Sequence, residues 1–396
     1  MSDSSGTDVS APESGATQPD LSGDAAALAA RFLALADDDF AGYSPTYERI
    51  ARSIAADPAS LALLLDAAPL GRTPVLALAA VHDLVLADPD SELAAVYAGR
   101  RDVDPWPPFR ALLHDRTAEV VRRMRTRSIQ TNEVGRSAAL FPALATVRSR
   151  AIAAGDPRPL ALVELGPSAG LNLLFDRYGV HYRRAGATVA TAGDAHSPVQ
   201  LECQLRGRGD PVLSGLPVPI ASRVGIDLNP VDVTDAAARR WLAACVWPDV
   251  PDRPDRLAAA IELARSDPPT LVTGDAVTDL APLVGALPAD VVPVVVATWA
   301  MAYLGHEGRA ALLAALDEVG ARRDLDLVTA EEPRITPWIP AVPAEVEACG
   351  DGDGDGTTTL LGLRTWRHGS VDDEALALCH PHVRWMAWVP GGGGPR

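Results

Sequence analysis

The sequence predicts an α/β protein: a Rossmann-like, doubly wound and mostly parallel sheet with a helical N-terminal domain and a small β insertion. Residues 25–152 contain helical patterns and no convincing strand. After residue 153, apolar runs of strand length alternate with helical patterns, which is typical of parallel sheets. Polar side chains then follow three successive strands, at the place where ligands bind in open α/β sheets.

Composition narrows the range of functions. The chain has 396 residues and a formal net charge of −17 at pH 7, which disfavours broad binding to nucleic acid. All 35 basic residues are arginine, so phosphate loops and Schiff-base enzymes that need a lysine are disfavoured too. Four scattered cysteines without a C-x-x-C motif predict neither a disulfide framework nor a zinc site.

The first part of the chain is predicted to be a tail followed by helices. Residues 1–24 are rich in Ser, Asp, Gly and Pro, which indicates a disordered tail rather than a signal peptide. No apolar run is long enough to span a membrane, so we expect a cytoplasmic protein without a membrane partner. In the helical domain, residues 25–152, Ser44 is expected to cap a helix whose first residue is Pro45.

Residues 153–396 are predicted to form the Rossmann-like domain. Its parallel strands are expected at 160–165, 223–228, 269–275, 291–300 and 325–333. Residues 180–222 interrupt this order with short antiparallel strands and form the β insertion. The stretches "TTLLGLRTWRHG" and "VRWMAWVP" predict a final antiparallel pair, and 349–357 a solvated loop.

The turn after the first strand, residues 166–170, reads Gly-Pro-Ser-Ala-Gly. This G-x-S-x-G string marks the nucleophile elbow of serine hydrolases, with Ser168 as the nucleophile, but it also fits a turn that binds a nucleotide cofactor. A hydrolase elbow needs an oxyanion loop from an earlier strand, and no strand is expected before Leu160. A turn on the first strand, leading into a helix with free N–H groups, favours the cofactor.

Acidic residues at three strand ends strengthen this interpretation. Glu164 ends a buried strand, where a carboxyl group needs a hydrogen-bonding or cationic partner. Asp227 stands where a carboxylate accepts hydrogen bonds from ribose hydroxyls, and Asp275 where an acid meets an adenine amino group. The predicted cofactor-binding residues are Glu164, Gly166, Ser168, Gly170, Asp227, Asn229, Asp275 and Ala276.

This arrangement resembles the class I S-adenosylmethionine-dependent methyltransferases, through "VELGPSAG", "GIDLNP" and "GDA" in that order. The resemblance spans about residues 155–335 and implies a methyltransferase-type sheet with S-adenosylmethionine at those strand ends. It also implies that "VVVATWAMAYL", with Trp299 and Tyr303, faces the substrate. Two features depart from the pattern: Ser168 replaces the middle glycine, and the first two motifs are unusually far apart.

The whole chain after the tail also resembles one uncharacterised prokaryotic family, the domain of unknown function numbered 2332. The matching stretches are "QTNEVGRSA", "VELGPSAGLNLLFDRY", "RVGIDLNPVDV" and "RWLAACVWPD". This resemblance implies a shared fold and no particular chemistry.

Further candidates lie outside the turn. Asn132 alone could cap the next helix, but Asn132, Glu133 and Arg136 cluster just before the first strand. Asn132, Arg136 and Trp299 are therefore predicted substrate contacts, and the candidate catalytic residues are Glu133, Glu332 and Tyr303.

Two other patterns carry weaker expectations. Arg253 and Arg256 mark either a helix-start surface or a clamp for a substrate carboxylate. His380 and His382 share one face of a strand without a third ligand, so no metal site is predicted.

The sequence therefore predicts an S-adenosylmethionine-dependent methyltransferase that acts on a small molecule. The alternatives are a non-catalytic nucleotide- or metabolite-binding protein of the same fold and a serine hydrolase that uses Ser168. The oligomeric state is not predicted.

Overall fold

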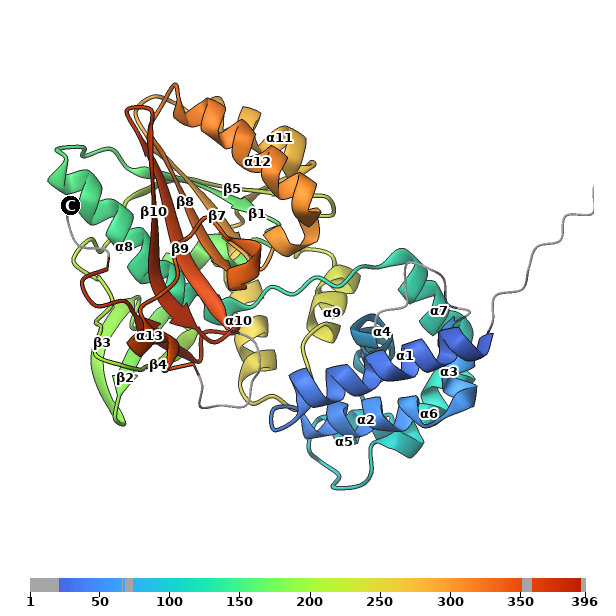
Figure 1. Cartoon of the computed structure of the whole chain (residues 1–396). Helices are drawn as coiled ribbons and strands as arrows, with labels where there is room; N and C mark the ends of the chain where they lie inside the picture. Colours follow the sequence, from blue (N-terminus) through green and yellow to red (C-terminus); the bar gives the residue numbers. More distant parts are fainter. Residues whose placement is uncertain (1–20, 66, 68–73, 351–357, 393–396) are drawn as a thin grey trace, which may run out of the picture.

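The computed structural model describes residues 21–65, 67, 74–350 and 358–392 (Figure 1). Helices α1–α7 gather at one end of the molecule, the sheet lies at the other, and α9 and α10 stand between them (Figure 1). Helix α1 already begins at Leu21, within the residues expected to form the tail. The rest of that tail and residues 351–357 of the loop expected at 349–357 lie outside the described residues.

The N-terminal helices have a core of their own. Their bounds are α1 Leu21–Leu35, η1 Ala36–Phe40, α2 Pro45–Ala55, α3 Pro58–Leu65, α4 Pro74–Ala87, α5 Glu92–Tyr97, α6 Trp106–Asp115 and α7 Thr117–Thr126. In α2, the three- and four-residue spacing of Tyr47, Ile50 and Ile54 places all three on one buried face. Within the described residues, no helix has the length and apolar character needed to cross a bilayer.

Helix α2 is capped from another part of the chain. Ser44 is its N-cap residue, as predicted, but the Ser44 hydroxyl makes no capping bond. It donates instead to Asp249 Oδ1, while Asp249 Oδ2 accepts from Thr46 N at 2.7 Å. The turn before α10 therefore supplies the carboxylate that stabilises the first turn of α2.

The eleven strands of the described chain form one sheet. They are β1 Leu160–Leu165, β2 Gly179–Arg184, β3 Ala187–Gly193, β4 Gln200–Leu205, β5 Ile220–Asp227, β6 Thr270–Thr273, β7 Val292–Thr298, β8 Leu325–Glu331, β9 Thr359–Arg367, β10 Ser370–Cys379 and β11 Trp385–Trp388. The spatial order is β3-β2-β4-β11-β10-β9-β8-β7-β1-β5-β6. Strands β6, β5, β1, β7 and β8 are mutually parallel, which confirms a mixed α/β fold with a large, mostly parallel sheet.

Helices cover both faces of the parallel strands. The other helices are η3 Val134–Arg136, α8 Ser137–Ala153, η4 Leu171–Arg177, α9 Ala236–Ala244, α10 Arg253–Ser266, α11 Ala276–Gly285, η5 Met301–Leu304, α12 Gly305–Gly320, η6 Pro333–Ile335 and α13 Ala344–Glu347. Leu160 and Leu162 pack with α8 and α10, whereas Val163 and Leu165 pack with α11 and α12. Because side chains alternate along a strand, Glu164 lies on the α8 and α10 face.

Several details differ from the expectation. Helix α8 was expected in the helical domain, yet its apolar residues belong to the core of the sheet. The stretch after the turn forms the 3₁₀ helix η4 instead of an α-helix. The insertion extends the same sheet: β2 and β3 pair antiparallel as predicted, but β4 runs parallel to β2 and to β11.

The final strand pair also differs from the prediction. Strand β9 forms its hairpin with β10, and β11 pairs antiparallel with the far side of β10. The sequence pattern misses β10 because its first half, Ser-Val-Asp-Asp-Glu, carries three acids and does not resemble a buried strand.

A buried ion pair joins three helices and provides a first test of this packing. Asp83 of α4 contacts Arg123 of α7 at 2.7 Å and Arg240 of α9 at 2.9 Å. We expect Asp83→Ala to lower the free energy of unfolding by about 3 kcal/mol, because it leaves buried Arg123 with only the more distant Glu119, at 3.5 Å, as a counter-charge. Asp104→Ala, which breaks an exposed pair with Arg49, should cost less than about 1 kcal/mol. Urea unfolding of both variants measures the difference, and equal losses would contradict the assignment.

Candidate ligand-binding site at the strand ends

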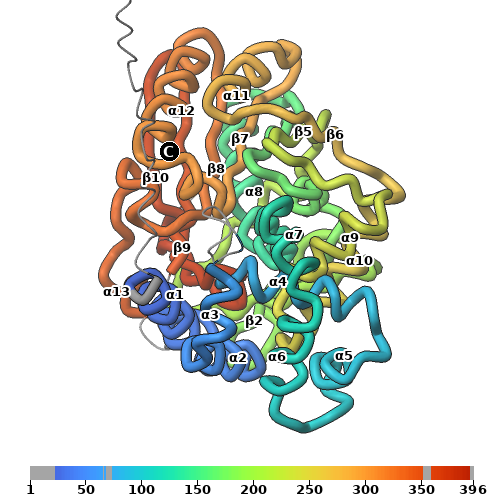
Figure 2. The backbone as a smooth tube through the Cα atoms, turned by 90° about the vertical axis from the view of Figure 1, so that its right-hand side faces the viewer, coloured from blue at the N-terminus to red at the C-terminus, as the bar shows by residue number. Residues whose placement is uncertain are grey.

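The carboxyl ends of β6, β5, β1, β7 and β8 meet at one edge of the sheet. Residues 127–136, which link α7 to the sheet through η3, run across this edge, so the helical end of the molecule adjoins it (Figures 1 and 2). Parallel topology thus brings together side chains that are up to about two hundred positions apart in the chain.

The turn after β1 adopts a backbone that favours glycine. Gly166, Ser168 and Gly170 all have positive φ, of 64°, 54° and 72°. A left-handed conformation costs a non-glycine residue such as Ser168 roughly 1–2 kcal/mol. Gly166 also packs tightly, since a Cβ there would stand 3.0 Å from Ala300 Cβ. Ser168 therefore occupies a position whose geometry suits glycine.

Every amide of this turn is already hydrogen-bonded. Gly166 N donates to Ile226 O, and Gly170 N donates to Pro167 O. Ser168 N donates to Asp227 Oδ2 at 3.0 Å. Ala169 N and Leu171 N both donate to Asn132 Oδ1, at 3.2 and 3.1 Å.

This pattern corrects the expectation that the turn offers free N–H groups to a ligand. With its amides taken by Asp227, Asn132 and backbone carbonyls, the turn has no backbone N–H left for a phosphate group. The Ser168 hydroxyl is buried and makes no hydrogen bond with any described residue, so no imidazole stands ready to activate it. The closed turn thus disfavours both a phosphate cradle and a hydrolase triad.

Glu164 lies beneath the turn as a buried carboxyl group. Only 2% of the residue is exposed, and Oε2 makes no hydrogen bond within the described chain. Burial raises the pKa of Glu164 to about 8, while Arg136 and a hydrogen bond from Asn172 partly oppose the shift. The group is therefore mostly neutral at pH 7 and would ionise beside a cation.

The ends of β5 and β6 face outward. Asp227 is half-buried, and its Oδ1 accepts from Asn229 N at 2.8 Å. Leu228 beside it is 65% exposed, which is unusual for so large an apolar side chain. Asp275 is exposed and caps α11, which begins at Ala276, by accepting from Val277 N. These side chains are accessible, in contrast to Glu164.

Asn132, Glu133 and Arg136 lie on the segment that crosses the edge, and each makes different contacts. Asn132 holds the turn, as described above. Glu133 is a buried anion rather than a poised base: Arg253 Nη2 lies 2.7 Å from its Oε2, and this guanidinium helps hold the pKa of Glu133 far below its usual range against the effect of burial. Arg136 is also buried and donates to Thr298 O at 3.1 Å, at the end of β7.

The two remaining catalytic candidates, Glu332 and Tyr303, lie near the ends of β7 and β8. Glu332 is half-buried and pairs with Arg334 at 2.5 Å, and Tyr303 is 82% exposed. The sequence analysis did not single out the adjacent Glu331, which is fully buried and accepts from Ala300 N and Met301 N at 2.7 and 2.9 Å. Its Oε2 makes no hydrogen bond in the described chain, and burial raises its pKa to about 7. Glu331 is the last residue of β8, whose residues are all buried, whereas Glu332 lies beyond the end of this strand.

Trp299 completes the cluster at the end of β7. It has a positive φ of 54°, its Nε1 donates to Thr359 Oγ1 at 2.8 Å, and the Arg136 guanidinium lies 5.8 Å from its ring. Trp299 therefore lies beside Arg136, its predicted companion in substrate contact.

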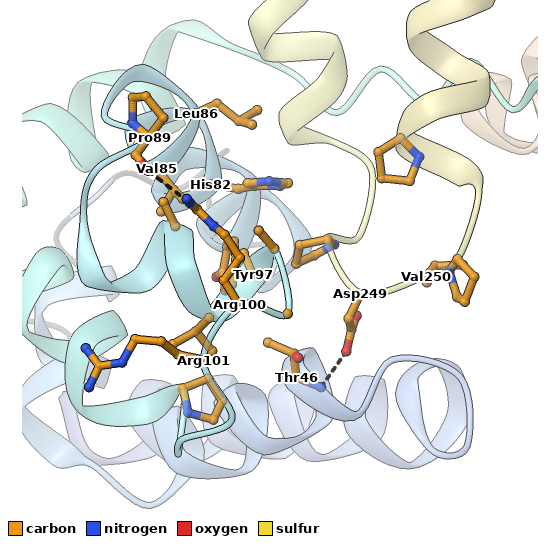
Figure 3. Close-up of a pocket in the computed structure, with 18 of the residues that line it drawn as sticks. Thr46, His82, Val85, Leu86, Pro89, Tyr97, Arg100, Arg101, Asp249 and Val250 are labelled. Atoms are coloured by element: carbon orange, nitrogen blue, oxygen red, sulfur yellow. Dashed lines mark hydrogen bonds between the residues drawn. The ribbon is translucent and has the colours of Figure 1, made fainter.

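A separate cleft of about 990 Å³ lies between the helical domain and the turn before α10. His82 and Tyr97 stand on one wall, facing Asp249 and Val250 on the other (Figure 3). None of the predicted site residues lines this cleft. Residues 248–252 form the turn before α10 and line the cleft. Arg253 follows them as the first residue of α10.

The fold and this strand edge define an α/β protein with a candidate ligand site at the carboxyl ends of its parallel strands. The chain belongs to the family described as "Uncharacterized protein conserved in bacteria (DUF2332)", whose model matches residues 29–388. This match confirms the family resemblance predicted from the sequence. A search of curated proteins finds no match to the chain.

Replacement of Asn132 tests whether this one side chain holds the turn. Asn132→Ala leaves two buried amides unsatisfied, so we expect it to lower the free energy of unfolding by about 2–4 kcal/mol. Asn229→Ala removes an exposed side chain and should change stability by less than about 0.5 kcal/mol. Thermal denaturation measures both, and hydrogen exchange at Ala169 and Leu171 should accelerate only in Asn132→Ala. Unchanged exchange there would show that another group holds the turn.

The pKa of Glu164 predicts how stability depends on pH. Its folded pKa of about 8 exceeds the ordinary value of 4.5. Its contribution is therefore full below pH 4.5 and is lost as pH rises through 8, because only the unfolded chain ionises in that window. Glu164→Gln keeps a neutral side chain, so its stability relative to wild type should rise across this window by at most about 5 kcal/mol.

Urea unfolding at a series of pH values measures this effect. Glu332→Gln is the matched control, because Glu332 is half-buried and paired with Arg334. Parallel pH profiles for wild type and Glu164→Gln would contradict the neutral state of Glu164.

Proposed function

We propose that the protein binds S-adenosylmethionine at the strand edge and transfers its methyl group to a small molecule. The observation that carries the proposal is Glu164, a buried carboxyl group with an oxygen that lacks any partner in the described chain. A buried acid of this kind is costly unless a cation approaches it. The amino group and the sulfonium of S-adenosylmethionine are such cations, and the cofactor carries no phosphate that the closed turn would have to bind.

The order of the parallel strands supports the proposal. In chain order, β1, β5, β6, β7 and β8 are strands one to five, and their spatial order is three-two-one-four-five. In doubly wound sheets with this order, ligands bind where the order reverses, outside the carboxyl ends of the central strands. Here that point lies between β1, which carries Glu164, and β7, which ends immediately before Trp299. As part of the proposal, these parallel strands belong to a Rossmann-like fold of methyltransferase type.

The accessible side chains next to β1 suit an adenosine. Asp227 has oxygens at the end of β5 that can accept from ribose hydroxyls, although both now accept from backbone amides. The exposed side chain of Leu228 offers an apolar surface to an adenine ring, and burial of that surface would favour binding. Asp275 ends the neighbouring strand and could accept from an adenine amino group, as predicted from the sequence.

When bound, S-adenosylmethionine supplies an activated methyl group on its sulfonium. The residues of this chain then have the task of orienting the acceptor and excluding water, which accounts for most of the rate in such transfers. Glu331 is the best-placed proton acceptor because it is buried, has a free Oε2, and has a pKa raised to about 7. The predicted alternatives fit less well. Glu133 is held in an ion pair, Glu332 pairs with Arg334, and Tyr303 is exposed to solvent.

Calorimetric titration of the full chain with S-adenosylmethionine tests the proposal. Because Glu164 is mostly neutral in the free protein, binding of the cation at pH 7 should release about one proton. Repeating the titration in two buffers with different heats of ionisation measures that proton. In Glu164→Gln the release should vanish and the Kd should rise at least about tenfold, whereas Glu332→Gln should bind like wild type.

Other results would favour the alternative functions. Binding without methyl transfer to any compound in a broad acceptor panel would favour a non-catalytic metabolite-binding protein. Labelling by a fluorophosphonate that is lost in Ser168→Ala would favour a serine hydrolase. Absence of binding at millimolar S-adenosylmethionine would exclude the methyltransferase.

A further inference from the structure

We propose that Arg136, Arg253 and Arg256 bind the anionic group of a small molecule, a carboxylate or a phosphate, where the helical domain meets the strand ends. The inference deepens the proposed function and rests on it in one respect: the molecule that carries the anion is the methyl acceptor. Anion binding itself stands on the arrangement of the arginines.

Three arginines from two elements converge on a single acid. Arg136 ends η3, and Arg253 and Arg256 lie in the first turn of α10. Glu133 is the acid between them, with Oε2 at 2.7 Å from Arg253 and Oε1 at 3.5 Å from Arg256. Within the described residues, Arg136 forms no ion pair and donates only to the backbone carbonyls of Thr298 and Pro381.

The positive charge in this cluster exceeds what Glu133 can neutralise. Arg253 is 5% exposed, and its Nη1 makes no hydrogen bond with a described residue. Burial lowers the pKa of Arg136, although the nearby carboxylates of Glu133 and Glu331 oppose this shift. Buried cations are normally paired, and an incomplete set indicates a missing anion. In a chain with a net charge of −17, this excess is local.

The groups around the cluster leave it accessible from one side. Tyr43 and His382 stack at 5.6 Å, and the Arg384 guanidinium lies 4.6 Å from the Tyr43 ring. Tyr43, His382 and Trp247 are half-buried and Arg384 is exposed, so the outer side of the cluster faces solvent. Burial, together with Arg253, lowers the pKa of His382 far below its usual value, so this imidazole is neutral and adds no charge to the cluster.

The chemistry of the cluster selects a small anion. Guanidinium groups present paired donors that match the oxygens of a carboxylate or a phosphate. The N-terminus of α10, a helix of 14 residues, adds its partial positive charge beside Arg253 and Arg256. Because Arg136 also contacts the end of β7, an anion held here would place its carrier next to the strand edge that contains Glu164. The cluster thus predicts an acceptor with an anionic end.

Calorimetric titration of the full chain with inorganic phosphate, and separately with succinate, tests the anion site. We expect saturable binding of at least one of these probes, weakened at least about tenfold in Arg256→Gln. Arg265→Gln is the matched control: it lies on the same helix, is exposed and pairs with Glu262. Arg256→Lys keeps the positive charge but lacks the paired N–H donors of a guanidinium. Its affinity for the anion should lie between those of Arg256→Gln and Arg265→Gln. Equal binding by the Arg256→Gln and Arg265→Gln variants, or no saturable binding of either probe, would overturn the inference.

A second titration separates this inference from the proposed function. Glu164→Gln should bind the anion like wild type, and Arg256→Gln should still bind S-adenosylmethionine. Cofactor binding without anion binding would refute the arginine site alone. Anion binding without cofactor binding would refute methyl transfer and leave the arginine site standing, with another carrier for the anion. Circular dichroism of each variant verifies that it is folded.

Discussion

One amide oxygen holds the candidate site together. Asn132 Oδ1 accepts from two buried amides of the turn after β1, which would otherwise be left without partners at a cost of a few kcal/mol. Asn132 lies on the segment that crosses the strand edge, so the same contact fixes the path of Glu133 and Arg136. Asp227 adds a third bond from the end of β5. The conformation of the turn and the position of the crossing segment both depend on these bonds.

Acidic and basic side chains at this edge lie mostly on two different sides. Glu164, which is mostly neutral until a cation approaches, and Asp227 lie by β1 and β5, whereas Arg136, Arg253 and Arg256 lie toward the helical domain around Glu133. Such a division suits two ligand groups of opposite sign held next to each other, because each side attracts one group and repels the other. A protein without lysine must build the cationic side from guanidinium groups, which hold oxygens through a planar fork of donors rather than as point charges.

The sequence was informative where local pattern decides structure. The continuous apolar run at 160–165 predicts β1 with its observed bounds, because a central parallel strand is buried on both faces. Contacts between distant segments could not be predicted in this way. The ion pair of Glu133 with Arg253 spans well over a hundred residues, and it turns a predicted base into a fixed anion. Glu331 and Glu332 are neighbours in the sequence, and only the position where β8 ends shows which one is buried.

The position of β11 has a consequence for biosynthesis. This strand lies between β4 and β10, although it follows every other strand of the described residues in the sequence. Until it has left the ribosome, β4 and β10 each present an unpaired edge, with backbone donors and acceptors open to a foreign strand. The sheet therefore closes only after β11 has been synthesised. During that interval, the two open edges are the parts of the nascent sheet most exposed to aggregation.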